Sequence, residues 1–247
     1  PLPGRHLTSL LTRYQGFGVL IDCGEGTQVA IREAGLGFKQ ISLICLTHFH
    51  ADHIAGLPGL LLTIGNSGRE APLTIIGPPH VGQVVDCLRV IAPQLPYPVE
   101  YSEIRQPGPV FQVADLTIFA FPVQHWIPCF AYKLELARRP KFDTARAKSQ
   151  EIPVQLWSRL QRGETVAAGG RTFTPEAVLG PVRKGLKLCY TTDLRPTPGL
   201  SDFAAQSDLF ICEGMYGDPD MQEKAVEHRH CMFSEAAEMA KQAEVQE

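Results

Sequence analysis

The sequence predicts an α/β domain built in layers, with a site at the ends of its strands. Apolar runs of strand length alternate along the chain with runs of helical periodicity. One strand-like run ends directly in a histidine-rich stretch at residues 48–53. A segment with a strong basic excess, residues 138–187, interrupts the alternation between two strand-like runs.

Strands and helices alternate on both sides of the histidine-rich stretch. The strand-like runs are apolar, and glycine or proline bounds several of them, as Gly77 does. The first helical run ends at Gly35 and Gly37, which are typical stop signals. We expect strands at residues 8–13, 18–21, 41–47, 73–76, 99–104, 110–113, 116–122, 130–136, 186–190 and 209–212, and helical segments at 27–34, 60–64, 81–91 and 221–243.

The composition is that of a globular chain. With 247 residues, 44% of them hydrophobic, the chain can bury a core as one large domain or two small ones. Seven scattered cysteines form no C-x-x-C pair, which favours reduced thiols in the cytoplasm, and we expect no membrane association. The chain opens on Pro1 without a complete first strand, so we expect it to be part of a longer protein.

Charge is distributed unevenly along the chain. Residues 138–187 hold eleven basic and four acidic side chains, a net charge of +7. Because the whole chain carries −3, the remainder carries −10. A basic insert on an acidic body is unusual for an enzyme of small molecules. Its prolines and the pair Gly169-Gly170 indicate an extension from the core, with an apolar cluster expected at Ile152, Leu156, Trp157 and Leu160.

The stretch His48-Phe49-His50-Ala51-Asp52-His53 holds three of the eight histidines and a carboxylate. Two histidines spaced i and i+2 after a strand can point the same way, and the following Asp-His can turn back toward them. This pattern predicts two neighbouring metals, one bound by imidazoles and the other by carboxylate and imidazole. The alternatives are a solvated polar loop and a tag-like tract, but a tag lacks the interleaved aspartate and the preceding strand.

Further polar side chains follow other predicted strands, where ligands of such a site would be found. His125 is a candidate ligand, and the carboxylate of Asp193 could bridge two metals. Asp22 is expected to orient a ligand. Glu213 could pair with His228 or with His230 as an acid/base unit, or serve only as a loop hydrogen-bond acceptor. The remaining histidines, His6 and His80, are expected at the surface.

Residues 47–53 resemble the H-x-H-x-D-H signature of the metallo-β-lactamase superfamily. Three more stretches resemble the ribonuclease Z family within it, namely Asp22-Cys23-Gly24-Glu25-Gly26-Thr27-Gln28, residues 56–61 and the insert from Phe142 to Pro181. The resemblance implies a four-layer αβ/βα sandwich, with residues 1–247 as one metallo-hydrolase domain. Residues 138–187 would be a protruding, flexible arm that binds transfer RNA.

The resemblance also implies roles for individual residues. His48, His50 and His125 would bind one metal, Asp52 and His53 the other, and Asp193 would bridge them. Asp52 would also act as general base, and Glu213 with His230 would handle the leaving-group proton. The sequence departs from the family at Val154-Gln155 and at Thr191-Thr192-Asp193-Leu194, and a further histidine ligand is expected beyond Glu247.

The resemblance leads us to expect a homodimeric cytoplasmic endoribonuclease with two divalent metal ions, with zinc as the expected metal. It would remove the 3′ trailer from precursor tRNA, leaving a 3′-hydroxyl on the transfer RNA. One alternative is a hydrolase of a small-molecule ester, lactone, sulfate or phosphodiester with the same metals. Another is an RNA-binding protein without activity.

Overall fold

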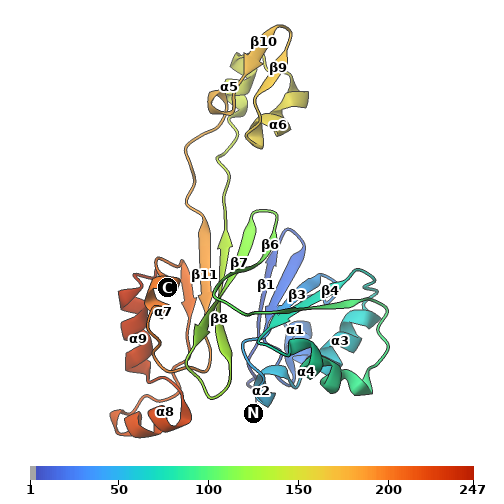
Figure 1. The fold of residues 1–247 in the computed structure, drawn as a ribbon. Helices are drawn as coiled ribbons and strands as arrows, with labels where there is room; N and C mark the ends of the chain where they lie inside the picture. The colour runs from blue at the N-terminus through green and yellow to red at the C-terminus, as the bar shows by residue number, and fades with distance from the viewer. Residues whose placement is uncertain (1–3) are drawn as a thin grey trace. The chain divides into compact units, whose positions relative to one another are not determined.

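The computed structural model describes residues 4–247. The chain divides into two compact units (Figure 1). The larger comprises the chain up to Leu134 and from Lys187 onward, and the smaller comprises Glu135–Leu186. No helix within residues 4–247 has the length and apolar character needed to cross a bilayer.

The first sheet of the larger unit has the order β1-β2-β3-β4-β5. Strands β1 and β2, both predicted from the sequence, form an antiparallel hairpin, and β2, β3, β4 and β5 run parallel. Parallel strands place their carboxyl ends at one edge, so residues that follow β2 and β3 meet there. The strands are β1 (Leu10–Tyr14), β2 (Phe17–Ile21), β3 (Ile41–Cys45), β4 (Leu73–Gly77) and β5 (Val99–Glu103).

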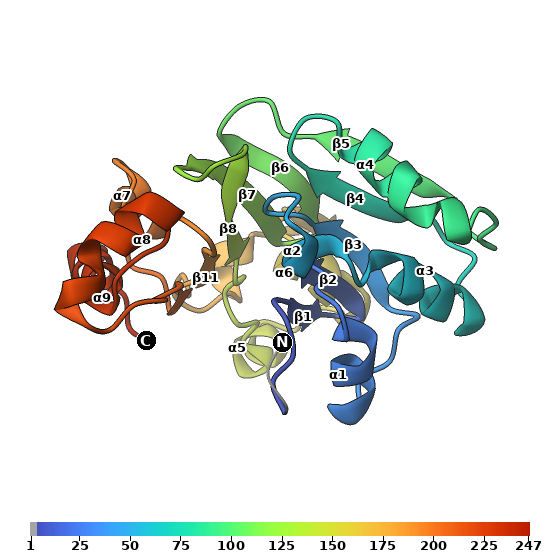
Figure 2. The ribbon, with the colours of Figure 1, turned by 90° about the horizontal axis from the view of Figure 1, so that it is seen from below.

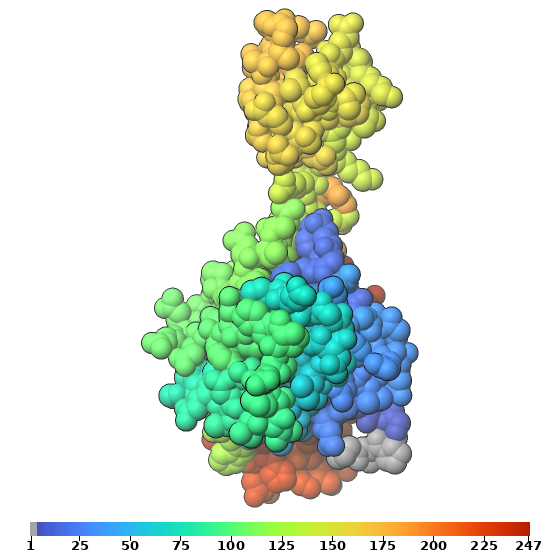
Figure 3. Space-filling view, turned by 90° about the vertical axis from the view of Figure 1, so that its right-hand side faces the viewer, coloured from blue at the N-terminus to red at the C-terminus, as the bar shows by residue number. Residues whose placement is uncertain are grey.

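Helices cover the outer face of this sheet (Figure 2). Their apolar sides form the main core with β2, β3 and β4, including Ile31, Leu60 and Val81. The space-filling view shows the chain of β4, α4 and β5, in cyan to green, forming one side of this unit (Figure 3). The helices are α1 (Thr27–Glu33), α2 (Ala51–Ile54), α3 (Leu57–Asn66), α4 (Val81–Leu88) and the 3-10 turn η1 (Arg89–Ile91).

The second sheet has the order β12-β11-β8-β7-β6 and faces the first (Figure 2). Tyr132 joins the two sheets, since its buried hydroxyl donates to the Leu46 carbonyl at 2.7 Å. Its strands are β6 (Gly108–Val113), β7 (Leu116–Val123), β8 (Cys129–Leu136), β11 (Leu186–Tyr190) and β12 (Leu209–Ile211).

Helices on the outer face of the second sheet complete a four-layer arrangement and confirm the predicted fold class. Leu200 and Met239 pack there against Ala131 of β8. The helices are α7 (Leu200–Ala204), η4 (Pro219–Met221), α8 (Gln222–His228) and α9 (Phe233–Gln242). Sequence periodicity predicted a largely helical segment at 221–243, but Arg229 takes a left-handed conformation (φ 62°) and the helix breaks until Phe233.

The smaller unit has an apolar core of its own. Ile152 and Leu160 are buried in it with Phe173, and Leu156 and Trp157 pack against them, which confirms the predicted cluster. Its two strands turn through Gly169-Gly170, both with positive φ, as a two-residue hairpin requires. The elements are α5 (Thr144–Ser149), η2 (Val154–Leu156), α6 (Trp157–Gln161), β9 (Val166–Ala168), β10 (Arg171–Phe173) and η3 (Pro175–Ala177).

Candidate metal centre

Histidines and carboxylates meet where strands of both sheets end. His48 and His50 follow β3, His125 follows β7, and Asp193 follows β11. Backbone bonds bring these ends together: Phe130 N–H donates to the Thr47 carbonyl at 3.0 Å, and Arg195 N–H donates to the Gln124 carbonyl at 2.9 Å. The first bond joins the two sheets at the site.

A fully buried carboxylate, Asp22, orients two of the histidines. It accepts hydrogen bonds from Thr47 N–H and Thr47 Oγ1, both at 2.8 Å, and lies 2.9 Å from His53 Nδ1. The Thr47 hydroxyl therefore has its hydrogen on Asp22 and accepts from His48 Nδ1, 3.0 Å away. Both histidines carry a proton on Nδ1, so the Nε2 atoms of both rings are directed into the site.

Three imidazole nitrogens converge at the first half of the site. His48 Nε2 and His125 Nε2 lie 3.1 and 3.2 Å from His50 Nδ1. The Nδ1–H of His125 is used by the Arg229 carbonyl at 3.3 Å, which leaves its Nε2 as a lone pair too. Burial lowers the pKa of His48 to about 3 and also lowers the pKa of His125, so these rings are neutral, as metal ligands must be.

The second half of the site sets His53 Nε2 against two carboxylates. His53 Nε2 is buried, makes no hydrogen bond, and lies 3.4 Å from Asp193 Oδ1 and 3.7 Å from Asp52 Oδ2. Burial opposes protonation of His53, but the carboxylates of Asp193 and Asp22 outweigh it and raise its pKa to about 10. Without a metal, Nε2 therefore carries a proton that faces these carboxylates, and a divalent cation between them would take the place of that proton.

The donor set fits divalent cations. Ligand atoms of His48, His50, His125 and Asp193 lie within 4.8 Å of one another, and so do those of Asp52, His53 and Asp193. Nitrogen and oxygen donors of this kind suit zinc and other divalent transition metals. Asp193 is common to both groups, and Asp52 is the most exposed of these side chains at 55%.

Glu213 and His230 lie beside Asp193, and possible ligand atoms of these three residues also lie within 4.8 Å of one another. Glu213 Oε2 is 2.9 Å from His230 Nδ1, its Oε1 accepts the Leu194 N–H, and His230 Nε2 is 4.0 Å from Asp193 Oδ2. The hydrogen bond to Glu213 raises the pKa of His230. His228, the alternative partner, instead contacts the Tyr216 hydroxyl at 3.0 Å.

The sequence did not indicate two residues that hold this arrangement in place. The Thr47 hydroxyl donates to Asp22 and accepts from His48 Nδ1, so it links the two side chains. The Arg195 guanidinium donates to the His230 carbonyl at 2.7 Å and forms an ion pair with Glu235. A threonine before a histidine and an isolated arginine carry no pattern that would have revealed them. His6 and His80 were predicted to lie at the surface. His6 Nε2 lies 3.0 Å from Glu33 Oε2, and neither histidine belongs to a group of possible metal ligands.

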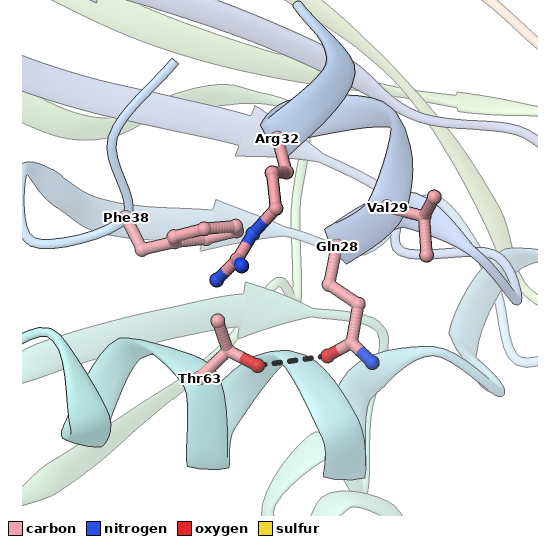
Figure 4. Close-up of a pocket in the computed structure, with 5 residues that line it drawn as sticks. All are labelled: Gln28, Val29, Arg32, Phe38 and Thr63. Atoms are coloured by element: carbon pink, nitrogen blue, oxygen red, sulfur yellow. Dashed lines mark hydrogen bonds between the residues drawn. The ribbon is translucent and has the colours of Figure 1, made fainter. Parts of the chain in front are cut away.

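A cavity of about 290 Å³ lies apart from the metal centre, between α1 and α3 (Figure 4). Thr63 donates to Gln28 Oε1 at 2.9 Å on one side of it. The lining residues are Gln28, Val29, Arg32, Phe38 and Thr63. None of them is a histidine or a carboxylate, so these side chains offer no acid/base pair and no metal ligand of the kind found at the centre.

Solved structures of similar fold define the class of protein. The chain aligns over its full length with human tRNase Z, short form, at a TM-score of 0.72 and 23% identity, covering 85% of that chain. It also aligns over 99% of its length with YhfI of Bacillus subtilis, a metallo-beta-lactamase fold protein, at a TM-score of 0.63 and 18% identity, covering 78% of that chain. The protein is thus an α/β protein of the metallo-β-lactamase fold with a histidine–carboxylate centre.

Sequence relatives identify the family within this fold class. The ribonuclease Z of Lachnoclostridium phytofermentans is 53% identical over 247 residues, which cover all of this chain and 81% of that protein. The ribonuclease Z of Clostridium acetobutylicum is 51% identical over 253 residues, covering all of this chain and 82% of that protein. The family model of the anti-Pycsar protein Apyc1 matches residues 5–87, the part with the H-x-H-x-D-H stretch. The chain belongs to the ribonuclease Z family.

Proposed function

We propose that the protein is a zinc-dependent endoribonuclease that removes the 3′ trailer from precursor tRNA. Membership of the ribonuclease Z family supports the substrate. The observation that carries the chemistry is the position of Asp193, shared by two metal-ligand groups and 4.0 Å from the paired His230. When bound, two divalent cations would neutralise charge on the scissile phosphate and lower the pKa of a water molecule.

The residues divide into ligands and proton carriers. His48, His50 and His125 would hold one cation and Asp52 with His53 the other, and Asp193 belongs to both of these groups. The exposed carboxylate of Asp52 is placed to accept a proton from the attacking water.

His230 is the proton donor in this proposal. Held by Glu213, it protonates the 3′ oxygen that leaves. The products are a 3′-hydroxyl on the transfer RNA and a 5′-phosphate on the trailer.

We further infer that residues 138–187 form a flexible arm that binds transfer RNA, inserted into a single metallo-hydrolase domain. Three of the four acids in this segment already pair with its arginines, as Glu164 does with Arg159 and Arg162. Lys141 and Lys148 are exposed and form no ion pair with a described residue, so their charge is available to phosphates. An acidic remainder of net charge −10 makes a local basic surface necessary for RNA binding.

Replacing residues 141–180 by a short Gly/Ser linker tests the arm. The linker can close because Gly180 N–H donates to the Lys141 carbonyl at 2.8 Å, so the two ends are neighbours. We expect weaker binding of transfer RNA and a flatter salt dependence, while hydrolysis of a small phosphodiester persists. Every proposed metal ligand lies outside the replaced segment.

The same preparation discriminates the alternatives. Equal loss of both activities would show that the segment supports the fold. Unchanged processing of precursor tRNA would remove the RNA-binding role. Hydrolysis of small esters or diesters without any cleavage of precursor tRNA would favour a small-molecule hydrolase. Absence of bound metal in the purified protein would favour an RNA-binding protein without activity.

The family resemblance also supports a homodimer in the cytoplasm. All seven cysteines are free thiols, five of them buried, which suits a reducing compartment. Light scattering coupled to size-exclusion chromatography would measure the mass in solution. A monomer at micromolar concentration would contradict the dimer.

A further inference from the structure

An exposed tryptophan stands beside the metal centre. Trp126 follows His125 directly, and 61% of its surface is exposed. A large aromatic side chain left open to water next to a catalytic centre is a candidate contact for substrate. The described residues with more exposed large apolar side chains are the aliphatic Val90, Ile91, Val154 and Val182, none of which adjoins a metal ligand in sequence.

Trp126 is also tied to the segment that carries His230. The Arg229 guanidinium lies over the indole ring, 5.0 Å from its centroid. The Arg229 carbonyl lies 3.3 Å from His125 Nδ1, and His230 is the next residue. The arginine covers one face of the indole, and much of the rest of the side chain is exposed to solvent.

We propose that Trp126 stacks on the nucleobase of the nucleotide whose 3′ oxygen leaves, so that Arg229, indole and base form one stack. The inference rests on the proposed function, because the position of that nucleotide is inferred from the role of His230 as the proton donor to its 3′ oxygen. The base attached to the same ribose is then the base next to Trp126. Stacking on an aromatic side chain tolerates any base, because each base has a π face.

An abasic substrate gives the sharpest test. Precursor tRNA with and without the base at that nucleotide would be cleaved by the wild-type protein, Trp126→Ala and the matched control Trp126→Phe, which keeps a ring. We expect Trp126→Ala to lower kcat/KM for the intact substrate roughly 5- to 100-fold. For the abasic substrate the same substitution should have almost no effect, because the stacking partner is already missing. Trp126→Phe should retain most of the rate.

Equal losses on both substrates would overturn the proposal and make Trp126 a support for Arg229 and His125. Failure of the wild-type protein to cleave either substrate would instead contradict the proposed function.

A second measurement needs no substitution of Trp126. The chain has two tryptophans, so Trp157→Phe leaves Trp126 as the single tryptophan, whose fluorescence can be excited selectively. A stacked base should quench its fluorescence when intact precursor tRNA binds, and the abasic RNA should quench it much less. Equal quenching by both RNAs would overturn the stacking proposal even if Trp126→Ala fails to fold.

Discussion

Replacing Asp22 by asparagine should weaken metal binding strongly with almost no change in the shape of the site. The substitution keeps the size of the side chain, and asparagine tolerates the left-handed backbone of this position (φ 57°). Its amide oxygen can still accept the Thr47 N–H, which Asp22 Oδ1 now accepts at 2.8 Å. The amide nitrogen then replaces Oδ2, the atom that accepts hydrogen bonds from Thr47 Oγ1 and His53 Nδ1.

The hydrogen bonds that Thr47 Oγ1 and His53 Nδ1 make to this atom would have to reverse their direction. His53 would accept at Nδ1 and carry its proton on Nε2, directed at Asp193, so its lone pair would be lost to a metal. The Thr47 hydroxyl would turn toward His48 Nδ1 and move that ring's proton to Nε2 as well. Loss of one orienting partner lowers metal affinity about 10- to 100-fold. Because two ligands change together, we expect a loss of at least about 100-fold.

Metal affinity of wild type and Asp22→Asn would be measured by competition with a chromogenic chelator, alongside thermal melting of the metal-free proteins. Removing a buried charge and losing charge-assisted hydrogen bonds have opposite effects on the free energy of unfolding, so that quantity should change by only about 1 kcal/mol. Asp86→Asn is the matched control, since Asp86 is exposed and its partners are Tyr101 and Arg89. Wild-type metal affinity in Asp22→Asn would refute the reasoning, and unfolding of the metal-free variant would make Asp22 a structural residue.

Three further predictions concern the site. His50→Ala should abolish cleavage and leave the melting temperature of the metal-free protein nearly unchanged, because His50 lies in the loop between β3 and α2; retained activity would exclude it as a ligand. His230→Ala should lower the rate roughly 10²- to 10⁴-fold at unchanged metal content, whereas loss of metal would make His230 a ligand. Glu213 raises the pKa of His230, and the protonated donor is lost as pH rises through that pKa, so Glu213→Gln should move the alkaline limb of the rate profile to lower pH. An unmoved limb would exclude the pairing from the proton transfer.

Local patterns were sufficient for the strands of the two five-stranded sheets and for the histidine-rich end of β3, but they did not reveal the short strands β9 and β10. Strand β3 is predictable because an apolar run buried on both faces differs from its surroundings in sequence. The break between α8 and α9 is not predictable in this way, because helical periodicity continues through residues 221–243. It depends on contacts from elsewhere in the chain, as when Arg195 binds the His230 carbonyl and Glu235.

The positions of the protons in the site also depend on a contact between residues far apart in the sequence. Asp22 and Thr47 are 25 residues apart, and only their contact fixes which nitrogen of His48 is free. Nothing in the spacing of the histidines carries that information. The sequence can therefore indicate which side chains are ligands, while the direction of their lone pairs follows from tertiary structure.

Three consecutive residues after β11 join the metal centre to the proton donor. Asp193 belongs to both metal-ligand groups, the Leu194 N–H donates to Glu213, and the Arg195 guanidinium donates to the His230 carbonyl. Leu194 is fully buried in the core beneath α7 and α9, so the backbone between the two polar side chains is held firmly. Because one rigid segment contacts both the ligand set and the Glu213–His230 pair, the spacing between hydrolytic centre and proton donor is fixed before substrate binds.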